Sequence, residues 1–287
     1  MLKMTGYDVL FAAAGNLYLL LALACIGVAL WKGQTWTLKL VWAALVFALF
    51  AAPIAPDMYR TVEYRSRLAK AQALFDERCK TAGEKIYRTV EGVDGVLLVN
   101  LRPDNVSYED QFARFDPYGY ESGGEWYIRS YLPGHWRTCV GDKAQCPPEK
   151  RAFLFVDAIS ETGGRVRYVS VDRVTSQPPL PGQNTGIKIV TENSIKNIAQ
   201  YGVRWEDIST NEDRQNWIAG GSLTVVDLRN GEVLAERSGY LMDPGLGSTA
   251  SARTPWSWAR HYAPACPKVD GHNFTFVRKV LHSSKGA

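Results

Sequence analysis

The chain has 287 residues, a formal net charge of +4 and a hydrophobic fraction of 46%. Its basic residues are spread along the sequence and form no stripe with interleaved aromatic residues, so we expect no nucleic-acid partner. Residues 57–287 are mixed in polarity and numerous enough to bury a sizeable core, as one large domain or two small ones.

Two apolar segments, 7–31 and 36–54, open the chain. Each is about as long as a helix must be to cross a hydrocarbon core roughly 30 Å thick. Trp31, Trp36 and Trp42 lie near the short polar turn between them, at depths that interfacial aromatic rings favour. The pattern predicts a transmembrane helical hairpin over 1–56, with the lipid bilayer as its partner. A buried core hairpin is the main alternative.

Two other roles fit the apolar segments less well. A cleaved signal peptide does not explain why the second apolar segment follows almost at once. The first segment carries only Asn16 and Cys25 as mildly polar groups, and neither marks an ion pathway. We therefore expect an anchor rather than a channel or a transporter.

Residues 57–83 have the pattern of a helix that leaves the membrane. Asp57 can cap its start, and Gly83 supplies a terminator. The apolar positions approximate one stripe: Val62, Leu68, Ala71, Leu74 and Phe75. We expect this juxtamembrane helix to lead into a soluble domain over 84–287.

Beyond this helix, short β-rich segments alternate with turn residues. The expected strands cover 85–90, 95–101, 126–132, 151–160, 165–172, 186–191, 203–208, 221–228 and 232–240. Asn230 and Gly231 join the last two strands and predict a tight two-residue hairpin, since both positions of that turn favour positive φ. Overall, we expect an α+β fold: the helical hairpin, a long helix and a mainly antiparallel β-sheet domain.

The polar domain contains an even set of four cysteines. Cys139 and Cys146 flank a short polar loop, whereas Cys79 and Cys266 lie near the two ends of the domain. One disulfide would close the loop, and a second would tie the C-terminal segment to the entry helix; such bonds persist in an oxidising compartment. The alternative is four free, buried thiols. No spacing typical of a zinc site occurs, so we expect no metal.

Two signals disagree about the side of the membrane on which this domain lies. Arg60, Arg65, Arg67 and Lys70 follow the second apolar segment, and the positive-inside rule then favours the cytoplasm. The cysteines favour the periplasm. Acidic residues such as Glu63 partly balance the arginines, so we expect a periplasmic domain.

The sequence lacks the usual catalytic motifs. It has no Gly-x-Ser-x-Gly elbow, no phosphate-binding Gly-rich loop and no His-Glu-x-x-His pair, and its four histidines stand apart. We therefore expect neither enzymatic activity nor a cofactor. An envelope enzyme that uses Asp110, Asp116 and Glu125 of the acidic segment 104–125 is the alternative, although a solvated loop explains this segment as well.

Aromatic residues beside glycine and serine mark a candidate recognition loop at 118–127. Tyr and Trp in such a setting are typical of protein interfaces, and loops on a rigid sheet often carry binding residues. The candidate binding residues are Asp116, Tyr118, Tyr120, Glu121, Glu125 and Trp126. An ordinary turn-rich connection is the alternative.

Three segments resemble a family of uncharacterised proteobacterial inner-membrane proteins: LFDERCKTAGEKIYRTVEGVDGV at 74–96, GGSLTVVDLRNGEVLAE at 220–236 and ACP at 265–267. The family has no assigned catalytic residues. Its members resemble genes that sit near interbacterial toxin effectors, including lipases of type VI secretion. The resemblance implies a bacterial inner-membrane location and an immunity protein, with a toxin or effector as its protein partner.

Two functions compete on these observations. The first is a membrane-anchored binding protein, most concretely an immunity protein that neutralises a toxin acting in the periplasm, where tethering raises its local concentration. The second is a cytoplasm-facing membrane effector or sensor with a ligand-binding β domain, which the arginines after the second apolar segment favour. We expect the first.

Overall fold

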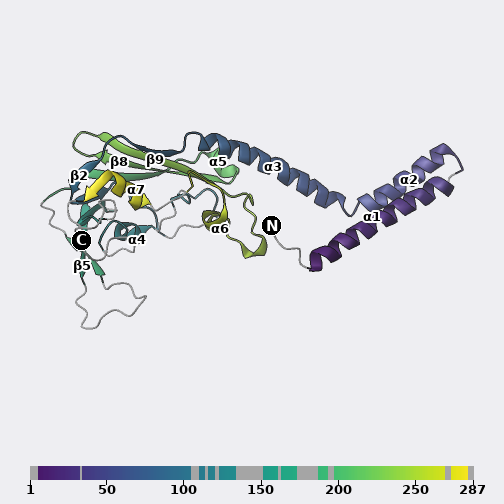
Figure 1. Ribbon diagram of the computed structural model, residues 1–287, viewed down its shortest axis with the longest axis horizontal. Coiled ribbons are helices and arrows are strands. Elements are labelled where there is room, and N and C mark those ends of the chain that lie inside the picture. The colour runs from purple at the N-terminus through teal and green to yellow at the C-terminus, as the bar shows by residue number, and fades with distance from the viewer. Residues whose placement is uncertain are drawn as a thin grey trace. The chain divides into compact units, whose positions relative to one another are not determined.

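The computed structural model describes residues 6–32, 34–104, 110–113, 116–119, 123–133, 151–160, 163–172, 187–192, 197–268 and 273–283 (Figure 1). The chain forms two compact units, Met1–Arg67 and Leu68–Ala287. The boundary between the units falls inside the predicted juxtamembrane helix rather than at its start, and each unit is described by itself below.

The first unit contains two helices that lie side by side, α1 (Gly6–Lys32) and α2 (Trp36–Ala51), and the start of α3 (Ala55–Cys79) (Figure 1). Tyr18 links α1 to α2: its hydroxyl donates to the carbonyl of Phe50 at 2.7 Å, and the two rings meet edge to face at 5.2 Å. Thr35 caps α2, because its Oγ1 accepts from the N–H of Leu38.

Within the described residues, one helical segment is long and apolar enough to cross a membrane by itself: Ala13–Lys32 of α1, with a mean hydropathy of 2.1. A signal sequence near an N-terminus has the same profile. Helix α2 reaches the necessary length only together with α3, from which a bend of 66° separates it, as in a broken span or a re-entrant loop. Both predicted helices are present, and the two-span hairpin stays a prediction.

The second unit begins with the C-terminal half of α3. Ala71 and Phe75 are buried there and pack with Ile218 and Tyr240 of the sheet. Val62, which the sequence places on the same stripe, belongs to the first unit and is 64% exposed. The predicted stripe therefore contacts the core only from its C-terminal part.

A mixed sheet forms the body of the second unit, with the strand order β1-β9-β8-β7-β3-β4-β5-β6, and β10 also pairs with β9. The strands are β1 (Gly83–Ile86), β3 (Gly95–Leu98), β4 (Phe155–Ile159), β5 (Arg165–Asp172), β6 (Ile187–Glu192), β7 (Tyr201–Asp207), β8 (Ile218–Asp227), β9 (Glu232–Met242) and β10 (Ala265–Cys266). Neighbouring strands are antiparallel, except that β3 runs parallel to β4 and β7. The α+β class and the mostly antiparallel sheet are therefore confirmed.

The main core lies between this sheet and two helices, α4 (Gly124–Arg129) and α7 (Asn273–Val280). Tyr127 and Ile128 of α4 and Phe274 and Val277 of α7 are almost completely buried in it. Directly after α7, strand β11 (Leu281–Ser283) pairs in parallel with β2 (Val90–Val93) as a second, small sheet.

Short helices complete the second unit. Helix α5 (Asn211–Gln215) starts with a reciprocal capping box between Thr210 and Asp213, and Arg78 of α3 donates to the same aspartate at 2.9 Å. Helix α6 (Pro255–Tyr262) follows the 3-10 turn η3 (Ala250–Ala252) and buries Trp256 against Trp217, with ring centroids 5.3 Å apart. These contacts fix the chain on either side of β8.

The predicted strand over 126–132 is wrong, because most of this segment forms α4 and the turn after it. The buried residues are Tyr127, Ile128, Tyr131 and Leu132, a spacing that belongs to one helical face rather than to one side of a strand. The rings of Tyr127 and Tyr131 meet edge to face at 5.4 Å, and their hydroxyls are 3.1 Å apart. The alternation of aromatic and polar residues suggested a strand, although the buried residues of this segment have the spacing of a helix.

The predicted β8–β9 hairpin is present, but its turn differs from the expected two-residue form. The strands pair up to Asp227 and Glu232, and the N–H of Gly231 donates to the carbonyl of Asp227 at 2.8 Å. Gly231 has a φ of 75°, whereas Asn230 is not among the residues with positive φ. The connection is thus a wider loop, and this loop places Leu228 and Arg229 at the end of the sheet.

Candidate binding site

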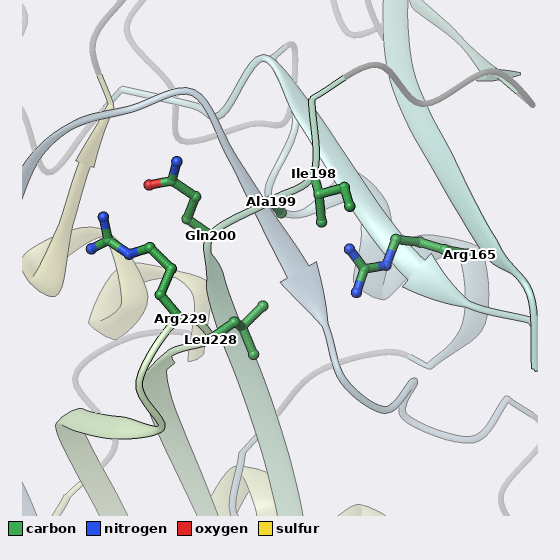
Figure 2. Close-up of a pocket in the computed structure, with 6 residues that line it drawn as sticks. All are labelled: Arg165, Ile198, Ala199, Gln200, Leu228 and Arg229. Carbon is green, nitrogen blue, oxygen red and sulfur yellow. The ribbon is translucent and has the colours of Figure 1, made fainter.

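A pocket of about 620 Å³ opens at the end of the sheet, where β5 and β7 begin and the β8–β9 loop turns (Figure 2). Its lining residues are Arg165, Ile198, Ala199, Gln200, Leu228 and Arg229. The volume lies within the range of sites that bind small molecules or single side chains. The pocket is open to solvent, so it can accept a group presented by a larger partner.

A buried ion pair supports the floor of this pocket. Asp157 of β4 accepts from Arg167 of β5 through both oxygens, at 2.8 Å from Nε and 3.0 Å from Nη2. Asp157 also accepts from the N–H of Ala199 at 3.2 Å, and Arg167 donates to the carbonyl of Asn197. The short segment before β7 is therefore fixed to two strands of the sheet rather than free to move as a loop.

The β8–β9 loop supplies a preorganised guanidinium. Arg229 donates to Asp227 from Nε at 2.9 Å and from Nη2 at 2.6 Å, and Nη2 also lies 3.1 Å from the hydroxyl of Tyr201. These hydrogen bonds lower the pKa of Asp227 to about 2 and raise the pKa of Arg229 above its usual value. The N–H of Leu228 donates to the carbonyl of Gln200 at 2.8 Å, so the loop and the floor are joined.

Arg165 provides a second guanidinium from the start of β5, where its backbone pairs with Ile159. Its side chain is exposed and makes no ion pair with any residue in the part of the chain that the structure describes. In Figure 2 the side chains of Arg165 and Arg229 flank Ala199 from the two sides, and Gln200 lies beside Arg229. Ile198 and Leu228 add apolar surface, with 61% and 38% of their area exposed.

The lining therefore offers two guanidinium groups, of which that of Arg229 is paired with Asp227, together with one amide and three apolar side chains. Guanidinium groups bind carboxylates and phosphates through paired hydrogen bonds. None of the six lining residues is a histidine, cysteine, serine or carboxylate, so the lining itself contains no nucleophile or general base. This arrangement suits recognition of an acidic group that is attached to an apolar one.

Two of the residues predicted for the recognition loop are buried, contrary to the expectation of an exposed interface. Asp116 accepts from Nη1 of Arg102 at 3.2 Å and from the N–H of Gly119 at 2.8 Å. The hydroxyl of Tyr118 donates to the carbonyl of Pro267 at 3.0 Å, and its ring belongs to a buried cluster. Both side chains are therefore part of the core.

Facing glycines explain how these side chains fit against the sheet. Gly221 of β8 and Gly239 of β9 are partners in the strand register. A Cβ atom at Gly221 would collide with the carboxylate of Asp116, and one at Gly239 would collide with the ring of Tyr118. The pair of glycines thus forms a shallow slot that the segment 116–119 fills.

Of the other predicted binding residues, those that the structure describes do not line the pocket either. Glu125 and Trp126 are exposed on α4, where Arg129 donates to Glu125 at 2.9 Å and lies over the Trp126 ring. Tyr120 and Glu121 lie outside the described residues. Arg165, Gln200 and Arg229, which the sequence did not single out, line the pocket instead.

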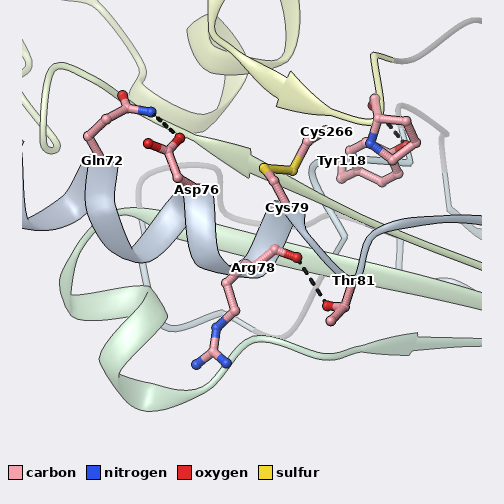
Figure 3. Close-up of a disulfide and its surroundings, with 8 residues drawn as sticks. Gln72, Asp76, Arg78, Cys79, Thr81, Tyr118 and Cys266 are labelled. Carbon is pink, nitrogen blue, oxygen red and sulfur yellow. Dashed lines mark hydrogen bonds between the residues drawn. A yellow bond between two sulfur atoms is a disulfide. The ribbon is translucent and has the colours of Figure 1, made fainter.

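One predicted disulfide is present. Cys79, the last residue of α3, bonds to Cys266 of β10, with the two Cα atoms 5.5 Å apart (Figure 3). Cys139 and Cys146, the other predicted pair, lie outside the described residues, and Cys25 is a free thiol in α1. A disulfide of this kind persists in an oxidising compartment.

Two further observations bear on the function of the chain, one on metal-binding clusters and one on similar proteins. Across the described residues, no three His, Cys, Asp or Glu side chains come together as a metal site would require. Comparison of the chain with protein-family models, with curated proteins and with solved structures finds no match.

Proposed function

We propose that the chain is a membrane-tethered binding protein whose α+β domain captures an acidic group of a protein partner. The observation that carries this proposal is the pocket between Arg165 and Arg229, which joins two guanidinium groups to exposed apolar surface. Arginine and apolar side chains together are typical of the residues that dominate the binding energy of protein interfaces.

Preorganisation supports a binding role for this pocket. Asp227 and Tyr201 orient Arg229, so its side chain loses little conformational freedom when a ligand binds. Its Nη1 atom takes no part in the hydrogen bonds to Asp227 and Tyr201 and points a pair of donors away from Asp227. The pair Asp157–Arg167 fixes the floor in the same way. A partner carboxylate therefore meets donors that are already in place.

Two further features support the setting in which the binding takes place. The segment Ala13–Lys32 of α1 is long and apolar enough to tether the domain to a bilayer. The disulfide Cys79–Cys266 favours a domain outside the reducing cytoplasm, and we propose the periplasmic side of a bacterial inner membrane. Tethering raises the local concentration of the domain at the membrane surface.

The resemblance described above gives the proposed class of partner. It points to a toxin that acts in the periplasm, so the binding protein would serve as an immunity protein that occludes the toxin. An acidic side chain next to an apolar one on the toxin surface is the group that the pocket would receive.

The test uses the full-length protein in nanodiscs and the proteins encoded by the neighbouring genes. We expect one of these proteins to bind, and the double variant Arg165→Ala/Arg229→Ala to weaken that binding at least tenfold. A lost charged hydrogen bond costs roughly 1.5–3 kcal/mol, which corresponds to such a factor. Arg204→Ala is the matched control, because Arg204 is an exposed arginine of β7 that pairs with Glu206 and lies outside the pocket.

Protection of cells supplies the second readout. Cells that produce the toxin in the periplasm should grow when the wild-type protein or Arg204→Ala is present and stop growing with the double variant. Full resistance of a deletion strain to every neighbouring effector would reject the immunity role. Equal binding by the double variant and the control would reject the pocket as the site of contact.

A cytoplasm-facing sensor is the second candidate, and Arg60, Arg65 and Arg67 after α2 favour it. Fusions at the C-terminus distinguish the two locations. Alkaline phosphatase is active when the domain lies in the periplasm, whereas a reporter that fluoresces only in the cytoplasm is bright when the domain lies inside.

A further inference from the structure

The N-terminal half of α3 carries an apolar stripe that the described chain leaves uncovered. Ala55, Met58, Tyr59 and Val62 have the spacing i, i+3, i+4 and i+7, so they lie along one face of the helix. Met58 is 62% exposed, Tyr59 71% and Val62 64%. A stripe of this kind normally faces a core, a partner or a membrane.

This stripe is not an extension of the face that packs on the sheet. Tyr59 and Leu68 are two and a half turns apart, so they lie on opposite sides of α3, about 180° from one another. Ala71 and Phe75, near Leu68 on the second side, are buried in the core of the second unit. The apolar face of α3 therefore changes sides close to the unit boundary, and packing on the sheet does not explain the first half.

Basic residues accompany the exposed stripe. Arg60 and Arg67 lie on the side of the helix opposite to Val62, and Arg65 lies at its border. Arg60 is 3.7 Å from Asp57, an exposed pair, and neither Arg65 nor Arg67 makes an ion pair with a described residue. An apolar face with arginines on the remaining surface is the pattern of a helix that lies in a membrane interface.

The position of the N-terminal half of α3 in the chain also indicates that a membrane covers the stripe. It follows the strongly apolar helix α2 after a short break that contains Pro53, and Pro56 lies in the first turn of α3. The bend of 66° between α2 and α3 is large enough to turn a chain from a steep path into one along a bilayer surface. The exposed stripe is thus continuous with the apolar helices of the first unit.

We propose that residues 55–67 form an interfacial helix that lies on the headgroup layer of an anionic membrane. Met58, Tyr59 and Val62 insert at the boundary between headgroups and acyl chains, roughly 5–10 Å deep. Arg65 and Arg67 remain at the level of the lipid phosphates, where Tyr59 also keeps its hydroxyl in a polar layer. This inference does not depend on the pocket or on its partner.

The test compares two tyrosines of this half of α3, Tyr59 on the stripe and Tyr64 on the other side. Each is replaced by cysteine in the full-length Cys25→Ser protein, under oxidising conditions, and carries a nitroxide label in phosphatidylglycerol-containing vesicles. The signal of the parent protein without the new cysteine is subtracted. We expect the label at 59 to collide more with oxygen and less with a water-soluble nickel chelate than the label at 64.

Two results would overturn the proposal. Equal access of the nickel chelate to both labels would place the stripe in water. Exclusion of both oxygen and nickel from the label at 59 would show that protein, rather than lipid, covers the stripe.

The variant Arg65→Gln/Arg67→Gln tests the choice of lipid. We expect it to raise nickel access at 59 in vesicles that contain phosphatidylglycerol and to make no difference in purely zwitterionic vesicles. An unchanged accessibility in the anionic vesicles would contradict the phosphate contacts. An intact Cys79–Cys266 disulfide in each variant shows that the second unit has folded.

Discussion

Asp157 and Arg167 face one another directly in the antiparallel register of β4 and β5, and their side chains form a bidentate ion pair that is almost completely buried. The same carboxylate accepts from the backbone of Ala199, so one ion pair connects the sheet to the floor of the pocket. Buried pairs of this kind depend on complete hydrogen bonding, because each charge has lost its hydration.

Removal of one partner of this pair should therefore be costly. We expect Asp157→Ala to lower the free energy of unfolding by about 3–5 kcal/mol, since Arg167 would remain buried without its counter-charge. Urea denaturation of the full-length protein in detergent measures the change. Glu206→Ala is the control, because its pair with Arg204 is half exposed and should contribute less than about 1 kcal/mol. Equal effects of the two substitutions would contradict this account.

The disulfide Cys79–Cys266 should stabilise the fold by restricting the conformations of the unfolded chain, since it joins positions 187 residues apart. We expect Cys79→Ala/Cys266→Ala to lower the free energy of unfolding by about 2–5 kcal/mol. Reduction of the wild-type protein should have a similar effect, whereas Cys25→Ser should have almost none because Cys25 is unbonded. A destabilisation by Cys25→Ser as large as that of the double variant would contradict the assignment.

Asp227 should make the stability depend on pH at the acid end. Its pKa is about 2 in the folded protein, against 3.8 for an ordinary aspartate, because Arg229 donates to it and Arg88 lies nearby. The stabilisation is therefore complete above about pH 4 and is lost as the pH falls towards 2. The difference in unfolding free energy between the wild type and Asp227→Asn should shrink across this window. A constant difference from pH 5 to pH 2 would contradict the role of Arg229.

The glycine slot on β8 and β9 should not tolerate a methyl group. We expect Gly239→Ala to destabilise the second unit by about 1–3 kcal/mol, because the new Cβ would overlap the ring of Tyr118. In a Tyr118→Ala background the same substitution should cost much less, which a double-mutant cycle in urea detects. Strict additivity of the two changes would show that the ring and the glycine are independent.

Local patterns account for the parts of the fold that the sequence predicts. The three long helices follow from long runs of apolar or helix-forming residues. The range of β5 matches its prediction, because polar and apolar residues alternate along it and Gly163 and Gly164 precede its start. The β8–β9 hairpin follows from Asn230–Gly231, although its loop is wider than predicted, and the side chain of Asp227 accepts a hydrogen bond from the N–H of Arg229 in that loop. Cys79 and Cys266 were paired correctly because they lie near the domain ends.

Long-range contacts account for what the sequence does not predict. No residue near Tyr118 in the sequence indicates that its ring packs against Gly239. The sequence alone therefore does not distinguish this buried tyrosine from an exposed one. The lining of the pocket is equally hard to predict from the sequence. Arg165 lies on β5 and Arg229 follows β8, and β7, β3 and β4 lie between these two strands in the sheet. Asp227 and Arg229 are two residues apart, so their pairing can be predicted from the sequence. The other residues that line the pocket with Arg229 come from distant parts of the chain and cannot be predicted in this way.

The bond between Cys79 and Cys266 also decides what a single cut in the backbone can release. A protease that cleaves one peptide bond anywhere between these two cysteines leaves the C-terminal fragment covalently attached to α3, and therefore to the apolar helices before it. Shedding of the domain then requires cleavage before Cys79, or cleavage together with reduction. A nicked molecule would stay at its place in the cell and would separate into two pieces only on a reducing gel.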